Sequence, residues 1–317
     1  MIIFRDQIEK ANKKDRKPPL TIRRLRRFIS RKEPGLVELL GRMWARHQQA
    51  ITYKEIREAL MSGTLTDILI ERWQEDYSKF ITSTLYPLWI ESMEASVTDL
   101  ARRYPTWSFD PTTAQIRTWA EENAAKFITN INNEQRKAVN RMVSYSATTG
   151  ISVDDLAVMI RPTIGLNARQ AEANLRYHNA VKTRYMELNG KPGHGSYSQA
   201  RIERIARESA IKYAAKQHRY RAQMIARYEL ASAYNQGEEE ATRQAQQEGL
   251  LGHCVKRSVS AGLLDTRTCE ECKRLERLGW IDFDEDFQTK FGPMSGPPYH
   301  NGCRCTKDIK ETDPPVF

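Results

Sequence analysis

The chain has 317 residues, 40% of them hydrophobic, and a formal net charge of +10. That length can bury a sizeable core in one large domain or in two ordinary ones. No apolar run approaches the roughly 20 residues that cross a bilayer, and the first six residues lack the apolar stretch of a secretion signal. These features argue against a membrane-spanning or secreted protein, and we expect a soluble protein that is cytoplasmic when it is made.

Positive charge is concentrated in the first 32 residues. They include twelve basic and three acidic residues, a net charge of +9, which leaves the rest of the chain at about +1. A basic segment can bind DNA phosphates through counterion release, can dock on an acidic protein surface, or can simply keep the terminus soluble. We take residues 1–34 as a basic N-terminal arm. The residues that we expect to contact double-stranded DNA are Lys13, Lys14, Arg16, Lys17, Arg23, Arg24, Arg26 and Arg27.

Residues after Pro34 have the pattern of successive amphipathic helices. Apolar side chains recur at spacings of three and four, and strand-like alternation is rare. Capping residues and glycines mark where several of these helices begin and end. The predicted boundaries are a start at Asp110–Pro111, an end at Gly150, a start at Ser152, and a helix from Asn167 to about Leu188.

A glycine-rich loop at residues 189–196 divides the chain. Beyond it, residues 199 to about 247 predict a long helix that is broken near Gln217–His218 and closed by Gly249. From His253 on, short apolar pieces, glycines and prolines indicate a small α+β end. The sequence therefore predicts a mainly α protein with a basic arm, a helical body at 35–195 and a Cys-rich C-terminal domain at 196–317.

All of the cysteines lie in the last fifth of the chain. Cys269 and Cys272 form a Cys-x-x-Cys motif, and about 30 residues later Cys303 and Cys305 form a Cys-x-Cys motif. A Cys-x-x-Cys turn places two sulfurs where both can reach a tetrahedral zinc, and Cys303 and Cys305 can complete the site, with His300 as a substitute for one of them. Reduced buried thiols and a disulfide that forms late in an assembled particle remain alternatives to a structural zinc.

A catalytic role for this cysteine cluster is disfavoured. A catalytic zinc needs an open coordination position and a nearby general base, and neither Glu270 nor Glu271 stands in a recognisable His-Glu pair. No glycine-rich phosphate loop, Ser-His-Asp order or paired-carboxylate pattern is found elsewhere. We therefore do not expect an enzyme.

The C-terminal third resembles the phage Mu F-like domain of phage head morphogenesis proteins, over about residues 206–310. The resemblance begins in the long helix, continues at Lys256, and is most specific in the Asp-x-Arg and His-x-x-Cys-Arg-Cys motifs. The residues that carry it are Arg221–Glu229, Ala233–Gly237, Lys256, Asp265, Arg267, Cys269, Cys272, Pro297, Pro298, His300, Cys303 and Cys305.

The resemblance implies a minor head protein of a tailed bacteriophage. Such a protein is a low-copy component of the capsid interior that associates with the portal, assists coat or scaffolding proteins in procapsid assembly, and can contact DNA. We interpret Asp265 and Arg267 as an ion pair that orders the loop before Cys269, and Glu229 and Asn235 as structural anchors.

Two other classes of function are open to the sequence. One is a zinc-bearing DNA-binding or nuclease-like protein, which predicts DNA affinity in the C-terminal domain rather than in residues 1–32. The other is a toxin-type enzyme, because some chains join this domain to ADP-ribosyltransferase modules, but no active-site pattern supports it.

Overall fold

The computed structural model describes residues 19–252, 255–261 and 268–312, and it confirms a mainly α fold with a small α+β C-terminal end. The chain forms two compact units. Unit 1 contains the described parts of Met1–Pro34, Ser83–Ala120 and Gln223–Phe317, and unit 2 contains Gly35–Thr82 and Glu121–Ala222. Each unit therefore joins segments that are distant in the sequence, whereas the predicted domains are continuous ranges.

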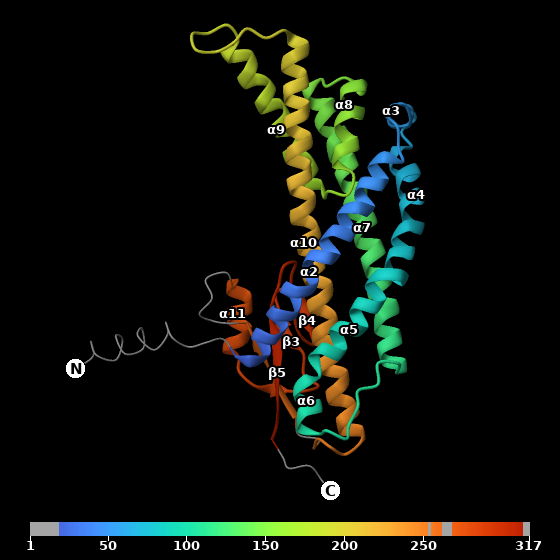
Figure 1. Cartoon of the computed structure of the whole chain (residues 1–317), viewed down its shortest axis with the longest axis vertical. Coiled ribbons are helices and arrows are strands. Elements are labelled where there is room, and N and C mark those ends of the chain that lie inside the picture. The colour runs from blue at the N-terminus through green and yellow to red at the C-terminus, as the bar shows by residue number, and fades with distance from the viewer. Residues whose placement is uncertain (1–18, 253–254, 262–267, 313–317) are drawn as a thin grey trace, which may run out of the picture. The chain divides into compact units, whose positions relative to one another are not determined.

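Helices dominate both units (Figure 1). The helices are α2 (Leu20–Gln49), α3 (Tyr53–Ser62), α4 (Leu65–Phe80), a π-helical turn (Ile81–Leu85), α5 (Tyr86–Ser96), α6 (Thr98–Arg103), α7 (Ala114–Thr149), α8 (Val153–Ile160), a 3₁₀ turn (Arg161–Thr163), α9 (Ala168–Leu188), α10 (Gln199–Gln247) and α11 (Glu270–Arg277). In the described part of the chain, no helix has the length and apolar character that a membrane span requires.

Several predicted helix boundaries are confirmed, because they depend on local hydrogen bonds. The Asn167 side chain accepts from the backbone N–H of Gln170, whose side chain caps Asn167 in return, so α9 begins with a capping box. Ser152 caps α8 in the same manner, by accepting from the N–H of Asp155. Gly150 has a φ of 69° and follows the last residue of α7.

Two predicted boundaries are wrong. Helix α7 begins at Ala114 rather than at Asp110, because the Asp110 carboxylate accepts from the N–H of Thr112, at 2.8 Å, and forms a turn before the helix. Helix α10 is continuous at Gln217–His218. There the Nδ1 of His218 contacts the Ala214 carbonyl oxygen, one turn earlier, at 2.8 Å within the continuous helix.

The second half of the predicted basic arm is a packed helix. Helix α2 begins at Leu20 and continues through Pro34. Ile22, Leu25, Phe28 and Ile29 lie on its buried face, each no more than 3% exposed. Apolar spacing of three and four thus makes residues 20–34 part of a core, even though the segment carries half of the net charge.

Unit 2 is organised around Trp44, whose side chain is 1% exposed. Its indole N–H donates to the Tyr77 hydroxyl at 3.2 Å. Gly165, at a φ of 92°, lies against the indole so closely that a Cβ would be 2.6 Å from a ring carbon. The buried indole therefore has a hydrogen-bond acceptor for its N–H and close packing against its ring.

Unit 1 contains all of the described strands, which lie beside the C-terminal half of α10 (Figure 1). Strands β1 (Val255–Ser260), β2 (Ile281–Asp282) and β5 (Thr306–Glu311) form an antiparallel sheet in the order β2-β1-β5, and Val255 pairs with Glu311. Strands β3 (Phe287–Thr289) and β4 (Gly292–Met294) form a separate hairpin. The strands are short, so the sheet alone supplies little core.

Helix α10 approaches α5 closely at Gly237. A Cβ built on Gly237 would lie 2.4 Å from the Met93 Cα and 2.6 Å from the Ser96 Oγ. We expect Gly237→Ala to lower the free energy of unfolding by about 1–3 kcal/mol, because the added methyl meets backbone that cannot move aside. Thermal or denaturant unfolding of the purified chain measures the change.

Gly41→Ala is the matched control. Gly41 also lies inside a helix, and a Cβ built there has nothing within 4 Å. Alanine should therefore leave stability unchanged or raise it by about 0.5–1 kcal/mol. Equal effects of the two substitutions would contradict the close approach at Gly237.

Candidate metal centre

The first two candidate ligands lie at the N-terminus of α11. Cys269 is the N-cap residue, and its Sγ accepts from the backbone N–H of Cys272 at 3.4 Å. Glu270 and Glu271 occupy the first turn and Arg274 lies in the last, an order that suits the helix dipole. The Cys-x-x-Cys spacing thus places both sulfurs on the first turn of a helix, where the dipole favours a thiolate.

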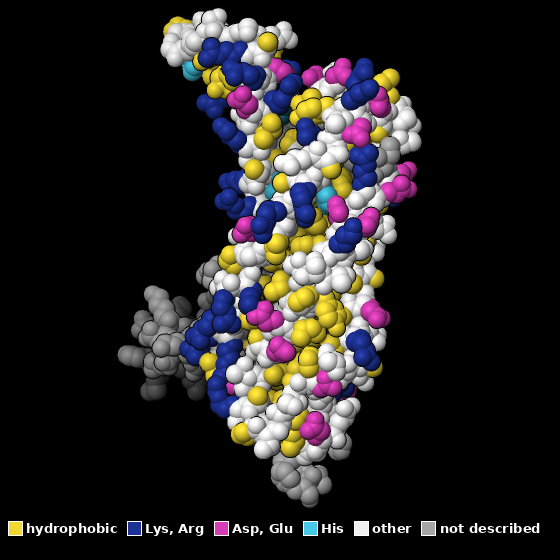
Figure 2. Space-filling model, turned by 45° about the vertical axis from the view of Figure 1, so that its right-hand side comes forward, with side chains coloured by type: hydrophobic (Ala, Val, Ile, Leu, Met, Phe, Trp, Pro, Cys, Tyr) yellow, Lys and Arg dark blue, Asp and Glu magenta, His cyan; other side chains and the backbone are white. Residues whose placement is uncertain are grey.

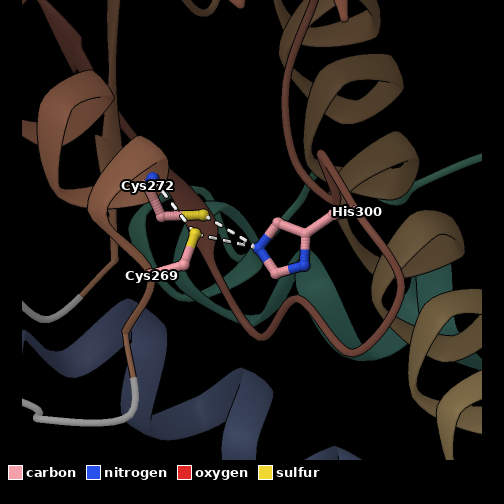
Figure 3. Close-up of side chains that lie close together, drawn as sticks. All are labelled: Cys269, Cys272 and His300. Carbon is pink, nitrogen blue, oxygen red and sulfur yellow. Dashed lines mark hydrogen bonds between the residues drawn. The ribbon is translucent and has the colours of Figure 1, made fainter. Parts of the chain in front are cut away.

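His300 presents one ring nitrogen to these sulfurs (Figure 3). Its Nε2 lies 3.2 Å from the Cys269 Sγ and 3.4 Å from the Cys272 Sγ. Its Nδ1 lies 3.0 Å from the Asn301 carbonyl oxygen. Because a carbonyl only accepts, Nδ1 carries a hydrogen, and Nε2 is the ring nitrogen that faces the sulfurs. This orientation is usual for a metal-binding histidine.

A tight turn brings Cys303 and Cys305 to the same place. The backbone N–H of Cys303 donates to the His300 carbonyl at 3.0 Å, and Gly302 has a φ of 77°. A Cβ on Gly302 would lie 2.8 Å from the Met224 Sδ of α10, so glycine is required both by conformation and by space. Asn235 of α10 donates its side-chain N–H to the Cys305 carbonyl at 3.2 Å and fixes the turn against the helix.

The separation of two of the sulfurs matches that of a tetrahedral metal site, whereas the His300 Nε2 lies slightly closer to the sulfurs than a bound metal would place it. Metal–sulfur bonds of about 2.3 Å and metal–nitrogen bonds of about 2.0 Å imply sulfur–sulfur separations of about 3.8 Å and sulfur–nitrogen separations of about 3.6 Å. The Cys272 and Cys303 sulfurs are 3.9 Å apart. A disulfide needs about 2.05 Å, and the four described cysteines are free. The cluster can therefore hold a metal ion in place of a disulfide.

Cys272 is common to both sets of neighbouring ligands. One set contains Cys269, Cys272 and His300, and the other contains Cys272, Cys303 and Cys305, with all ligand atoms of a set within 4.8 Å of one another. Cys272, Cys303 and Cys305 are buried. Five donors are thus available for the four positions of a tetrahedral site, and of these Cys269 and His300 are partly exposed.

The side chains of the cluster share protons with one another. Hydrogen bonds from the Cys272 and Cys305 thiols hold the pKa of Cys303 well below its usual range, and Cys272, which shares its proton with Cys303, has a raised pKa. Hydrogen bonding to Cys303 raises the pKa of His300 to about 9, although burial opposes the shift. A bound cation would replace these shared protons and neutralise the sulfurs.

A buried ion cluster supports β5, the strand that follows Cys305. The Lys307 Nζ lies 2.7 Å from the Glu239 Oε2 on α10, and the Arg257 guanidinium lies 3.6 Å from the same oxygen. Lys307 and Arg257 are each 1% exposed. Burial would raise the pKa of Glu239, but Lys307 and Arg257 lower it, so the carboxylate stays charged. Sequence reasoning missed this cluster, although Glu239 lies one helical turn after Asn235.

The two other predicted anchors lie in different settings. Glu229 is 6% exposed and accepts from the Trp89 indole N–H at 3.1 Å, which joins α10 to α5. Asp265 and Arg267, predicted to form an ion pair, lie outside the described residues, as do Lys13, Lys14, Arg16 and Lys17 of the basic arm.

The described basic residues of the arm divide into two groups. Arg24 forms an ion pair with Asp99 of α6, and Arg26 donates to the Ala261 carbonyl at 3.4 Å. Arg23 and Arg27 are exposed one turn apart on α2. Figure 2 shows Lys and Arg side chains gathered at the lower left of the molecule, where the first turns of α2 lie.

Comparison with protein-family models, with curated protein sequences and with solved structures finds no match to this chain.

Cys272→Ser tests the metal centre. The wild-type chain should hold about one metal ion, and Cys272→Ser should lose it, because Cys272 belongs to both ligand sets. Elemental analysis of the purified proteins after dialysis measures the metal content. A wild-type chain that holds no metal after expression in metal-replete medium would refute the site.

Tyr299→Phe is the matched control. Tyr299 packs in the same buried cluster, and its hydroxyl has no hydrogen-bond partner within the described structure. Its loss removes one polar atom beside the site but no ligand, so the metal content should stay unchanged. The variants His300→Ala and Cys305→Ser then distinguish these two candidate ligands, because only substitution of a residue that binds the metal should lower the metal content.

Proposed function

We propose that the cluster binds a structural zinc ion. Three described features support zinc: the sulfur-rich donor set, the tetrahedral separations, and the burial of Cys272, Cys303 and Cys305. A zinc ion bound there supplies no chemistry beyond holding α11 to the turn at residues 300–305. The elemental analysis described above also identifies the metal, and iron in place of zinc would contradict this assignment.

We propose that the chain is a minor head protein of a tailed bacteriophage and not an enzyme. The observation that carries the proposal is that the Cys-x-x-Cys and His-x-x-Cys-Arg-Cys motifs, which belong to the resemblance to the head morphogenesis family, meet in one cluster. Asn235, which belongs to the same resemblance, bonds to Cys305.

The partners in this proposal are the portal and the coat or scaffolding proteins, inside the capsid. Co-expression of the chain with the portal and coat proteins encoded beside it should yield heads that contain a few copies of it near the portal. Mass spectrometry of purified heads gives the copy number. A chain that never enters heads would contradict the proposal and would favour a DNA-binding or nuclease-like protein.

The exposed arginines of α2 are the surface that we propose contacts DNA. Arg23, Arg27 and Arg31 are exposed at intervals of four residues and therefore lie along one face of the helix. Arg24 and Lys32, by contrast, form ion pairs with Asp99 and Glu91. Of the three exposed arginines, Arg31 also lies over the Phe28 ring, with its guanidinium carbon 5.9 Å from the ring centroid.

Substituting Arg23, Arg27 and Arg31 together by Gln should weaken DNA binding in a salt-dependent manner. If each arginine contacts one phosphate, the slope of log K against log salt concentration should fall by about 2.7. Fluorescence anisotropy with labelled duplex DNA at several salt concentrations measures the slope. Point substitutions are preferable to deletion of the segment, because deletion would remove buried residues such as Leu25 and Phe28.

The control changes three exposed basic residues of α10, Lys212, Lys216 and Arg219, to Gln. This variant alters the net charge by the same amount on another surface. The slope of log K against log salt concentration should therefore change much less than in the α2 variant. Equal effects of the two triple substitutions would show that DNA responds only to net charge and would refute a specific role for α2.

A further inference from the structure

Unit 1 contains a pocket of about 200 Å³ that is separate from the metal centre. Residues of α2, α6, α10, β1 and β5 line it, and its walls are largely apolar, with Leu100, Leu251, Val255 and Ile309 among them. A pocket of this size holds on the order of ten water molecules, or a ligand of several non-hydrogen atoms. Its dimensions therefore suit a small ligand with an apolar part.

Two polar groups face this pocket from α10. Tyr234 is 2% exposed, and its hydroxyl has no hydrogen-bond partner within the described structure. Glu238, one turn further along, is partly exposed, and its Oε2 accepts from the Thr306 hydroxyl at 3.0 Å. A hydroxyl and a carboxyl at i and i+4 lie side by side on the helix, where one donor group can reach both.

The cations around the pocket are engaged elsewhere. Lys307 of β5 is held by Glu239 at 2.7 Å, and Lys310, which lines the pocket, lies over the Trp280 ring with its Nζ 4.5 Å from the ring centroid. At the rim, Arg24 pairs with Asp99, and Arg103 donates to Glu311 at 2.8 Å. Glu238 is thus a carboxyl in a largely apolar pocket without a cation at hydrogen-bonding distance.

The titration of Glu238 reflects this lack of a cation. Burial raises its pKa to about 8, and the attraction of Lys307 offsets the shift only in part, while Asp308 adds to it. The carboxyl is therefore mostly protonated at neutral pH. A cation placed beside it would recover the ionised form and release the proton to solvent.

We propose that this pocket binds an aliphatic primary ammonium group, which donates to Glu238 and to the Tyr234 hydroxyl while its alkyl chain packs on the apolar walls. The ligand is either a free alkylamine or the side chain of a lysine from a partner protein, which share this chemistry. An anion is disfavoured, because the arginines at the rim are already paired with Asp99 and Glu311. This site is independent of the proposed function in phage heads.

Isothermal titration calorimetry of the full chain with n-butylamine and with Nα-acetyl-lysine amide tests the proposal. We expect saturable binding of one amine per chain. Glu238→Gln keeps the size of the side chain but removes its negative charge, and it should weaken binding by roughly ten- to a hundredfold. If only butylamine binds, the ligand is a free amine. If butylamine and Nα-acetyl-lysine amide both bind, the pocket also accepts a lysine side chain.

Glu240→Gln is the matched control. Glu240 lies on the same helix, is 7% exposed, and accepts from Gln236 at 3.0 Å. The same change of charge there should leave amine binding within about twofold of wild type, because Glu240 does not line the pocket. No binding of either amine, or equal losses in the two variants with both folded by circular dichroism, would overturn the proposal.

Discussion

The C-terminal end of this protein depends on the meeting of thiols and an imidazole from two segments about 30 residues apart. Cys269 and Cys272 come from the first turn of α11, and His300, Cys303 and Cys305 come from a turn. The elements around them are small: a helix of eight residues, and strands of two to six. Elements of this size rarely supply enough apolar contact to stay folded alone, so a metal ion bound at the cluster would contribute a large share of their stability.

Helix α10 is the support on which this end is built. From it, Gly237 permits the approach of α5, Asn235 holds the Cys305 carbonyl, and Glu239 binds Lys307. The three residues lie within five positions, so one stretch of helix positions a helix, the metal-binding turn and a strand. The pocket with Tyr234 and Glu238 opens on the same stretch, so a ligand there would bear on β5 through Thr306.

The sequence predicted features that depend on local bonds. The caps at Ser152 and Asn167 are satisfied by residues three positions away, and the spacing of the cysteines indicated the cluster before any geometry was known. Features that depend on distant partners were not predictable. The charge of residues 20–34 suggested an arm, because the partners that bury Ile22 and Leu25 come from elsewhere in the chain, and the pairing of Glu239 with Lys307 joins residues 68 positions apart.

The most direct test of a structural metal is amide hydrogen exchange before and after removal of the metal by a chelator. If the metal holds the C-terminal end together, amides of α11 and β5 should lose protection on its removal. Amides of α9, which belongs to unit 2, should keep theirs. Unchanged protection in α11 and β5 after complete loss of the metal would show that packing alone maintains this end, and would contradict a structural role for the cluster.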